Sequence, residues 1–387
     1  MKILYHHRTM ARGAEGTHII SIVNGFKKLG HDVFIVSPPG VDTLKVAGGR
    51  PIDKSEVKTT GINSFWKLLS RHAPQFGFEI SEFLYNLYAI VKLSMEVKRQ
   101  GPIDLIYERN ANFLFAGVVV SKIFTIPLFI EVNEVVGLKR ARAICFTRMA
   151  EKIESYVFAN ATTLFPVSSN LKKRIVSICP NADVRVIPNA IDPVRFSTAT
   201  ATTVKEKYNT EGMMILGFVG WFDNWDRLDM LIDVQKELVK NNCNSLLMLV
   251  GDGPVVSELK LKIDKENMGD QVLLTGPVPK NEVVDYIAAF DIGVLAHSNE
   301  FGSPIVLFEM MALGKCVVAP RLDPILDVVE DGVNGVIFNP LDMQDLFNKT
   351  KWLLQHPEEM KKIGENAKDI TYSEHTWDKN AEKILSK

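Results

Sequence analysis

The chain has 387 residues, of which 46% are hydrophobic and 24% are charged, proportions typical of a globular protein. This composition excludes a disordered chain, a coiled coil and a collagen-like fibre, and the length suits two domains. None of the four cysteines (Cys145, Cys179, Cys243 and Cys316) lies close to another in sequence, so neither a disulfide framework nor a zinc knuckle is indicated.

The net charge of -1 conceals an asymmetry between the two halves of the chain. Residues 1–190 contain 25 lysines and arginines against 15 acidic residues, whereas residues 191–387 contain 20 against 31. This difference indicates two separate bodies. We expect the basic half to attract an anionic partner or surface, unless its basic faces are merely solvated.

No long apolar segment has the character of a membrane span. The first residues run directly into a short strand, too short for the core of a secretory signal. The longest apolar stretch, residues 113–130, is interrupted by Lys122 and Pro127, which predicts a buried helix followed by a buried strand. We expect a cytoplasmic protein, with any membrane contact peripheral and at the inner face.

Strands and helices alternate along the first half. Strands are expected at residues 2–5, 33–37, 104–107, 128–132 and 184–187. Helices are expected at 17–29 and 113–124. Residues 61–99 break the rhythm with aromatic side chains mixed with basic ones. These aromatics form either part of the core or a surface for an amphipathic acceptor or a membrane.

The second half repeats the alternation more clearly. Its expected strands are residues 215–219, 246–250, 272–274, 292–295 and 316–319. Its expected helices are residues 228–240, 255–265, 281–290 and 305–313. Such alternation predicts two α/β domains, each a doubly wound, Rossmann-like parallel sheet, facing each other across a cleft. We place the boundary at residues 188–193, with an N-terminal domain of residues 1–190 and a C-terminal domain of residues 191–370.

The segment after the expected strand 292–295 is the strongest candidate for a ligand site. It enters a helix with Ser303 as the expected N-cap and Pro304 at the first helical position. The free N–H groups of Ser303, Ile305 and Val306 would suit a phosphate. Glu309, one turn later, would suit sugar or ribose hydroxyls. The alternative is an ordinary capped helix with a partly buried glutamate.

Other strand ends offer further candidates. Gly220 follows a strand and lets the backbone approach a ligand, and Arg227 could pair with a diphosphate or simply be solvated. A loop with Gly13 and Gly16 follows the first strand, but its spacing is not that of a dinucleotide-binding fingerprint. Carboxylates and an amide end the strand 128–132, at Glu131, Asn133 and Glu134.

Order and spacing of several short segments make the chain similar to the family-4 retaining glycosyltransferases of the GT-B fold, also called glycosyl transferases group 1. The resemblance covers nearly the whole chain. It rests on residues 13–16, 30–33, 104–109, 131–134, 186–192, 218–220, 249–254, 276–278, 308–315 and 331–335.

The resemblance implies a role for each matched position. Ser303, Ile305 and Val306 would hold the donor diphosphate, Glu309 the ribose, and Val278 would lie near the base. Gly13 and Gly16 would let a loop cover the donor. Residues 371–387 would form a helix that crosses back to the N-terminal domain. The positions proposed for donor binding also include Gly220, Trp221, Glu300, Phe301 and Gly302.

Four positions depart from the family pattern. Phe301 stands where the family has a glutamate, Trp221 where an arginine is common and Asp226 where a lysine is common. Arg227 is a possible substitute for that basic pair, and Asn133 occupies the place of a histidine. We assign the catalytic roles to Glu309, Arg227, Asn133 and Glu134.

These observations predict a metal-independent hexosyltransferase without a cofactor. It would move a sugar from a UDP- or GDP-type donor to an acceptor hydroxyl, in polysaccharide, glycolipid or glycoconjugate synthesis. The acceptor is expected to be lipid-linked or anionic, and no nucleic acid partner is expected. Candidates for the basic patch are Lys139, Arg140, Arg142 and Arg148. The alternatives are a non-catalytic GT-B partner subunit and a nucleotide-sugar epimerase of the same fold.

Overall fold

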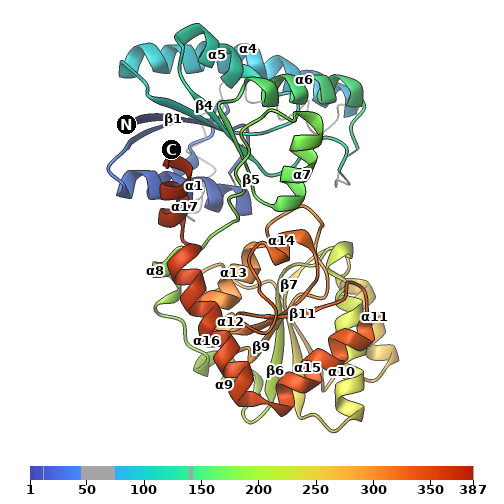
Figure 1. Ribbon diagram of the computed structural model, residues 1–387. Coiled ribbons are helices and arrows are strands. Elements are labelled where there is room, and N and C mark those ends of the chain that lie inside the picture. The colour runs from blue at the N-terminus through green and yellow to red at the C-terminus, as the bar shows by residue number, and fades with distance from the viewer. Residues whose placement is uncertain (12, 45–74, 139–142, 387) are drawn as a thin grey trace. The chain divides into compact units, whose positions relative to one another are not determined.

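A computed structural model describes residues 1–11, 13–44, 75–138 and 143–386 of the chain (Figure 1). It divides into two compact units. Unit 1 comprises Met1–Ile187 and Trp377–Lys387, and unit 2 comprises Pro188–Thr376. Each unit contains one sheet in which all the described strand pairs are parallel, so the predicted class of two Rossmann-like α/β bodies is confirmed.

Unit 1 is built on a five-stranded sheet of order β2-β1-β3-β4-β5. The strands are β1 (Lys2–His6), β2 (Asp32–Val36), β3 (Leu105–Arg109), β4 (Leu128–Val132) and β5 (Thr163–Pro166). The helices are α1 (Ala14–Lys28), α4 (Gln75–Gln100), α5 (Ala116–Phe124), α6 (Thr147–Asn160), α7 (Ser169–Ile178) and α17 (Trp377–Leu385). Strands β1, β3 and β4 are almost wholly buried, as expected for a parallel sheet covered on both faces.

The strand order of unit 1 reverses at β1. Helix α1 therefore covers one face of the sheet, while α4, α5 and α6 cover the other (Figure 1). Helix α17 packs along α1. The carboxyl ends of β1 and β3 are neighbours at this reversal, the place where open α/β sheets bind ligands.

For unit 1, the sequence-based expectation of a strand at residues 184–187 is wrong, whereas the helix and strand expected within residues 113–130 are present. Residues 184–187 are not a strand, because Val184 makes only one isolated bridge to Leu164. The last strand is instead β5, whose four residues end in a proline and carry too little pattern to detect. The apolar stretch 113–130 forms a helix and a strand, α5 and β4, as predicted; β4 is almost wholly buried, and α5 is buried over its first turns but exposed at Lys122 and Ile123.

Unit 2 is built on a six-stranded sheet of order β11-β10-β9-β6-β7-β8. Its strands are β6 (Met214–Trp221), β7 (Ser245–Asp252), β8 (Val272–Gly276), β9 (Ile292–Val294), β10 (Cys316–Pro320) and β11 (Val336–Phe338). The order reverses between β6 and β9, so the carboxyl ends of these two strands flank the switch point.

Helices complete unit 2 around an apolar core. They are α8 (Pro193–Phe196), α9 (Thr202–Tyr208), α10 (Leu228–Lys240), α11 (Val256–Lys265), α12 (Val283–Ala289), α13 (Ile305–Ala312), α14 (Asp323–Leu326), α15 (Met343–Gln355) and α16 (Pro357–Glu374), with the short 3-10 turn η1 (Asn224–Asp226) after β6. Helix α10 illustrates how an amphipathic helix contributes to this core. Its buried side chains include Leu228, Leu231 and Leu238, which recur at helical spacing.

Candidate active site

The strongest candidate site of unit 2 is the loop that joins β9 to α13. The loop leaves the switch point of the sheet and enters α13 at Ile305. The N-cap is Pro304 rather than the predicted Ser303, and no side chain caps the helix. Ser303 lies one residue before this N-cap, and its hydroxyl accepts a hydrogen bond from Asn189 instead of capping the helix. The first turn of α13 therefore has uncapped N–H groups at its positive end.

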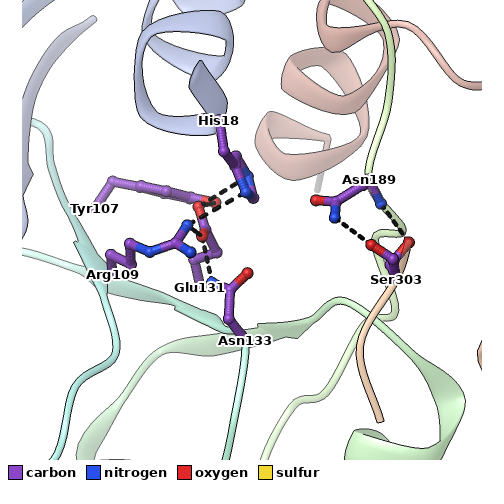
Figure 2. A network of polar contacts seen from close by, with 7 residues as sticks. All are labelled: His18, Tyr107, Arg109, Glu131, Asn133, Asn189 and Ser303. Carbon is purple, nitrogen blue, oxygen red and sulfur yellow. Dashed lines mark hydrogen bonds and ion pairs between the residues drawn. The ribbon is translucent and has the colours of Figure 1, made fainter. Parts of the chain in front are cut away.

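Ser303 is held by Asn189 instead (Figure 2). The Asn189 main-chain N–H donates to Ser303 Oγ at 3.0 Å, and Asn189 Nδ2 donates to the Ser303 carbonyl at 2.6 Å. Both residues are buried. Within the described part of the chain, the N–H groups of Ser303, Ile305 and Val306 have no hydrogen-bond acceptor. These three amides are the geometry that an anion needs.

The residues just before Ser303 have different roles. The N–H groups of Phe301 and Gly302 both donate to Asn299 Oδ1, at 3.3 and 2.5 Å. The amide of Gly302, a residue predicted to bind the donor, is therefore engaged in a local turn. Glu300 is exposed and Phe301 is half-buried. The loop is thus shaped by Asn299, which the sequence did not single out.

Glu309 lies one turn into α13 and is paired with Arg195. Arg195 Nη1 is 2.6 Å from Glu309 Oε1, and Arg195 Nη2 donates to the Lys280 carbonyl at 3.3 Å. Burial raises the pKa of Glu309, against the opposing influence of Arg195 and Lys280. Burial, and then Arg195, lowers the pKa of Lys280. Sequence analysis missed both cations, because α8 has only four residues and Lys280 follows β8 in an irregular segment.

Arg227 lies at the carboxyl end of β6, in a region occupied by other charges. Its Nε and Nη2 donate to the two carboxylate oxygens of Asp229 at 2.9 and 3.0 Å. The residue has a left-handed backbone, with φ of 50°. Together with residues of η1 and α11 it lines a hollow of about 390 Å³. The guanidinium predicted to meet a diphosphate is thus engaged by a neighbouring carboxylate.

The other positions near β6 and β8 are open to solvent to different degrees. Gly220 and Trp221 are exposed at the end of β6, and Trp221 exposes 66% of its surface. Val278 is half-buried against the core. Asp226 accepts a hydrogen bond from the Asp223 N–H, and burial raises its pKa to about 7. Asp226 therefore shapes the turn after β6, where the family commonly has a lysine.

Unit 1 carries a polar network around Glu131, at the carboxyl ends of β3 and β4 (Figure 2). Arg109 and Asn133 Nδ2 donate to Glu131 Oε1. Tyr107 Oη donates to Oε2 at 3.5 Å, and His18 Nε2 lies 3.3 Å from the same oxygen. Burial opposes ionisation, yet His18 and Arg109 lower the pKa of Glu131. Glu131 is therefore an ionised carboxylate surrounded by donors.

The tautomer of His18 follows from its neighbours. Arg109 Nη1 lies 3.2 Å from His18 Nδ1, and a guanidinium can only donate. Nδ1 is thus the acceptor, and the Nε2 proton points to Glu131. Burial lowers the pKa of His18 to about 4, so the ring is neutral at neutral pH. Its ring packs 4.6 Å from that of Trp377, also in unit 1.

Asn133 is oriented by this network. Because Nδ2 donates to Glu131, its Oδ1 points away from that carboxylate, and it accepts no hydrogen bond from any residue that the structure describes. The neighbouring Glu134 is half-buried. The network brings together Glu131 and Asn133, which the sequence singled out, with His18 and Arg109, which it did not. No local motif links those positions, which lie far apart in the chain.

The glycine loop before α1 has a strict steric requirement. A Cβ on Gly16 would lie 2.2 Å from the carbonyl oxygen of Ala11, which is a main-chain atom and not the end of a flexible side chain. Gly13 is the exposed N-cap of α1, and its N–H donates to Glu15 Oε1 at 3.2 Å. Gly16 is therefore required by the close approach of two backbone segments.

Two family models match the chain, one for each half. "Glycosyltransferase Family 4" matches residues 15–195, and "Glycosyl transferases group 1" matches residues 201–370. The chain belongs to this family of glycosyltransferases and is an enzyme of the GT-B type, as the resemblance predicted.

Individual relatives agree with this assignment. Alpha-monoglucosyldiacylglycerol synthase of Acholeplasma laidlawii is 22% identical over 95% of the chain and 92% of the relative. N-acetyl-alpha-D-glucosaminyl L-malate synthase of Bacillus anthracis is 27% identical over 54% of the chain and 52% of the relative. The crystal structure of HepE from Anabaena, solved in complex with UDP, aligns with a TM-score of 0.74 at 19% identity, covering 99% of this chain and 98% of that one.

Two further features of the described residues bear on a membrane span and on a metal site. None of the helices they form is both long and apolar enough to cross a membrane. Among the same residues, no three histidines, cysteines or acids are grouped as metal ligands. Independence from metals remains a prediction.

Proposed function

We propose that the protein transfers a sugar, with retention of configuration, from a nucleoside-diphosphate sugar of the UDP or GDP type to an acceptor hydroxyl. The product would be a glycolipid, polysaccharide or other glycoconjugate. The observation that carries this proposal is the set of three amides at Ser303, Ile305 and Val306, at the start of α13, which meet no acceptor among the residues that the structure describes. They offer N–H donors and a positive helix end to a diphosphate.

The leaving group explains why such a site is useful. In the transfer, the bond between the sugar C1 and the β-phosphate oxygen breaks, and a bond from C1 to the acceptor oxygen forms. The diphosphate gains negative charge, which the α13 amides stabilise. In a front-side attack the acceptor proton passes to the departing phosphate oxygen. Retention then needs no carboxylate nucleophile.

Glu309 is assigned to the ribose. Its Oε1 is occupied by Arg195, and its Oε2 accepts no hydrogen bond from the residues described by the structure. Arg195 and Lys280 help to keep this buried carboxylate ionised, so that it can accept from ribose hydroxyls. Val278 would contact the base, and the exposed backbone at Gly220 and Trp221 would approach the donor. Gly13 and Gly16 would form a loop over it.

Asn133 is assigned to the acceptor hydroxyl. Its side chain is oriented by Glu131, which leaves Oδ1 as an acceptor for a donated proton. An amide cannot remove that proton, and in this mechanism it need not, because the departing phosphate takes it. Glu134 would contribute nearby charge. This arrangement is consistent with an asparagine where the family commonly has a histidine.

The names of two relatives support retention of configuration. The relatives from Acholeplasma laidlawii and Bacillus anthracis carry "alpha" in their names. Nucleoside-diphosphate donors of D-glucose-type sugars have an α linkage, so an α product means that configuration is kept. The first of these names also contains diacylglycerol, which supports a lipid acceptor. HepE, whose structure contains UDP, supports a uridine donor.

The test is a ligand screen combined with removal of one amide. Ile305 is the first residue of α13, where proline fits a helix but has no N–H. In a thermal-shift screen of nucleoside diphosphates and their sugars, we expect one family of nucleotides to raise the Tm of the wild type. Ile305→Pro should weaken the affinity for that nucleotide about ten- to a hundredfold, the usual cost of a hydrogen bond to a charged group.

Matched controls isolate the amide. Ile305→Ala keeps the N–H and should bind nearly as well as the wild type. Met343→Pro makes the same change at the first residue of α15 and should not affect binding. Equal affinity of Ile305→Pro and wild type would contradict the diphosphate site. A donor converted without any acceptor would indicate an epimerase, and NMR of the glycoside product would report retention directly.

A further inference from the structure

Helix α4 of unit 1 exposes an apolar face to solvent. Seven large apolar side chains each expose between 37% and 67% of their surface: Phe76, Ile80, Phe83, Leu84, Leu87, Val91 and Met95. Their spacing of three, four and seven residues places them on one side of the helix. The stripe extends over about 29 Å at 1.5 Å per residue. This set is called the α4 stripe below.

The opposite side of α4 buries polar residues. Both oxygens of Glu79 accept main-chain N–H groups, from Cys145 at 2.7 Å and Phe146 at 2.8 Å. Asn86 Nδ2 donates to the Phe113 carbonyl at 2.8 Å, and its Oδ1 accepts from the Phe115 N–H at the same distance. These contacts fix the rotation of the helix. Turning the α4 stripe inward would break them and leave buried charges unpaired.

An outward apolar face of this size requires a partner. Scattered exposed apolar residues are ordinary, but a continuous stripe on one helix marks an interaction surface. The aromatic side chains of this region were open to two interpretations, core or surface. The core interpretation is wrong for Phe76 and Phe83, which are exposed, whereas Phe78, Tyr85 and Tyr88 are half-buried. Phe65 and Trp66 lie outside the described residues.

The neighbouring helices α5 and α6 also expose large apolar or aromatic side chains. Figure 1 shows α4, α5 and α6 in one layer on the same side of the unit 1 sheet. Ile123 on α5 is 61% exposed and Tyr156 on α6 is 43% exposed. The Lys122 ammonium lies 5.0 Å from the centre of the Tyr156 ring. Lysine beside an exposed tyrosine is common at the interface between lipid and water.

Charge identifies the kind of partner. Residues 1–190 carry an excess of ten positive charges. Five of their acidic residues are buried: Glu79, Glu96, Glu108, Glu131 and Glu154. The described residues of this half contain 15 lysines and arginines, none of them buried, against 13 acidic residues, of which these five are buried. Their surface therefore carries more positive than negative charge, which favours an anionic partner. Lys139, Arg140 and Arg142, which were predicted for the basic patch, lie outside the described residues. On α4 itself, Lys98 and Arg99 follow the α4 stripe at its carboxyl end.

We propose that the α4 stripe lies in the surface of a lipid bilayer with anionic headgroups, its apolar side chains among the acyl chains and the basic residues of unit 1 at the headgroups. Amphipathic helices flanked by basic residues bind anionic membranes in this way. The role of this contact rests on the proposed function, because a lipid acceptor would reside in the bilayer. The contact itself does not require sugar transfer.

The test is co-sedimentation of the full chain with vesicles. We expect binding to vesicles of phosphatidylcholine mixed with phosphatidylglycerol, weaker binding to phosphatidylcholine alone, and weaker binding at high salt. The double variant Leu87→Glu/Val91→Glu should lower the partition coefficient about tenfold or more, because it places two charges among acyl chains. The control is Leu261→Glu, at a residue of unit 2 that is 70% exposed.

Two further measurements distinguish loss of membrane binding from misfolding and from dimerisation. Far-UV circular dichroism and Tm should match the wild type in both variants, since the changed side chains are exposed. Light scattering after size-exclusion chromatography tests whether two copies pair through the α4 stripe. A dimer that the double variant splits, with vesicle binding unchanged, would overturn the proposal. Vesicle binding without any nucleotide-induced shift in Tm would instead refute the proposed function alone.

Discussion

Arg195 and Glu309 form an ion pair that joins the short helix α8 to the first turns of α13. The Nη1 to Oε1 distance is 2.6 Å; the Glu309 side chain is 13% exposed and that of Arg195 is 28% exposed. Asp192 caps α8 and thereby positions Arg195, which is three residues later. The pair constrains which carboxylate oxygen of Glu309 can face a ligand. It therefore links residues 192–195, at the start of unit 2, to the proposed ribose contact.

Removing Arg195 should change the pH dependence of nucleotide binding. Burial already raises the pKa of Glu309, and Arg195 opposes that effect. In Arg195→Ala the pKa should rise further, so the carboxylate becomes protonated at a higher pH. Because a ribose hydroxyl donates to the ionised form, the acid limb of the binding profile should move to higher pH. Isothermal titration of the nucleotide across a pH series measures this shift.

Glu309→Gln supplies the control for that experiment. It removes the titrating group, so the corresponding acid limb should disappear, and turnover should fall about ten- to a thousandfold. An Arg195→Ala profile that superimposes on the wild type would contradict the electrostatic role assigned to the pair.

Arg227 gives a second test, because its ion pair leaves two roles open. If it stabilises the departing diphosphate, Arg227→Ala should lower turnover about ten- to a thousandfold with little change in Tm. Asp229→Asn is the matched variant, since it removes the carboxylate that engages Arg227 and leaves the guanidinium in place. We expect Asp229→Asn to retain activity. Equal losses in both variants would show that only the ion pair matters, and wild-type rates in both would exclude Arg227 from catalysis.

The sequence predicted the fold well because its signals are local. Helix α10 was predicted at residues 228–240, where the structure has it, since apolar side chains repeat at helical spacing over its whole length. Strand β5 was missed because four residues ending in proline carry little pattern. The α13 entry was predicted one residue early, because the Ser303 hydroxyl binds Asn189 rather than capping the helix.

The site was harder to predict because its contacts join distant segments. Ser303 and Glu309 were singled out from one short stretch, where the helix start is visible in the sequence. Their partners lie more than a hundred residues earlier, Asn189 within the predicted domain boundary and Arg195 just after it. In unit 1, His18 meets Glu131 only because β1 and β4 lie in one sheet with α1 beside it. Spacing along the chain contains none of this information.

The Gly16 position allows a prediction about stability. In Gly16→Ala the new methyl group would lie 2.2 Å from the Ala11 carbonyl oxygen, so the backbone before α1 must move. We expect a loss of about 1–3 kcal/mol in the free energy of unfolding, the usual cost of overpacking. Gly269→Ala is the control, because nothing lies within 4 Å of the Cβ position there. Urea unfolding of both variants measures the difference, and equal midpoints would refute the close approach.

His18 predicts how unit 1 responds to acid. Burial lowers its pKa from 6.5 to about 4, so between these values the unfolded chain binds a proton that the folded chain does not. Stability should therefore fall as the pH drops from 6.5 towards 4, with His18 contributing at most about 1.4 kcal/mol per pH unit.

His18→Gln cannot bind that proton. Its free energy of unfolding is expected to be lower at pH 7, because the contacts to Glu131 and Trp377 are lost, but to decline less steeply on acidification. His356→Gln, at an exposed residue of unit 2, controls for loss of an imidazole. Urea unfolding at a series of pH values gives the slopes, and equal slopes for His18→Gln and wild type would show that the ring is not held neutral beside Glu131.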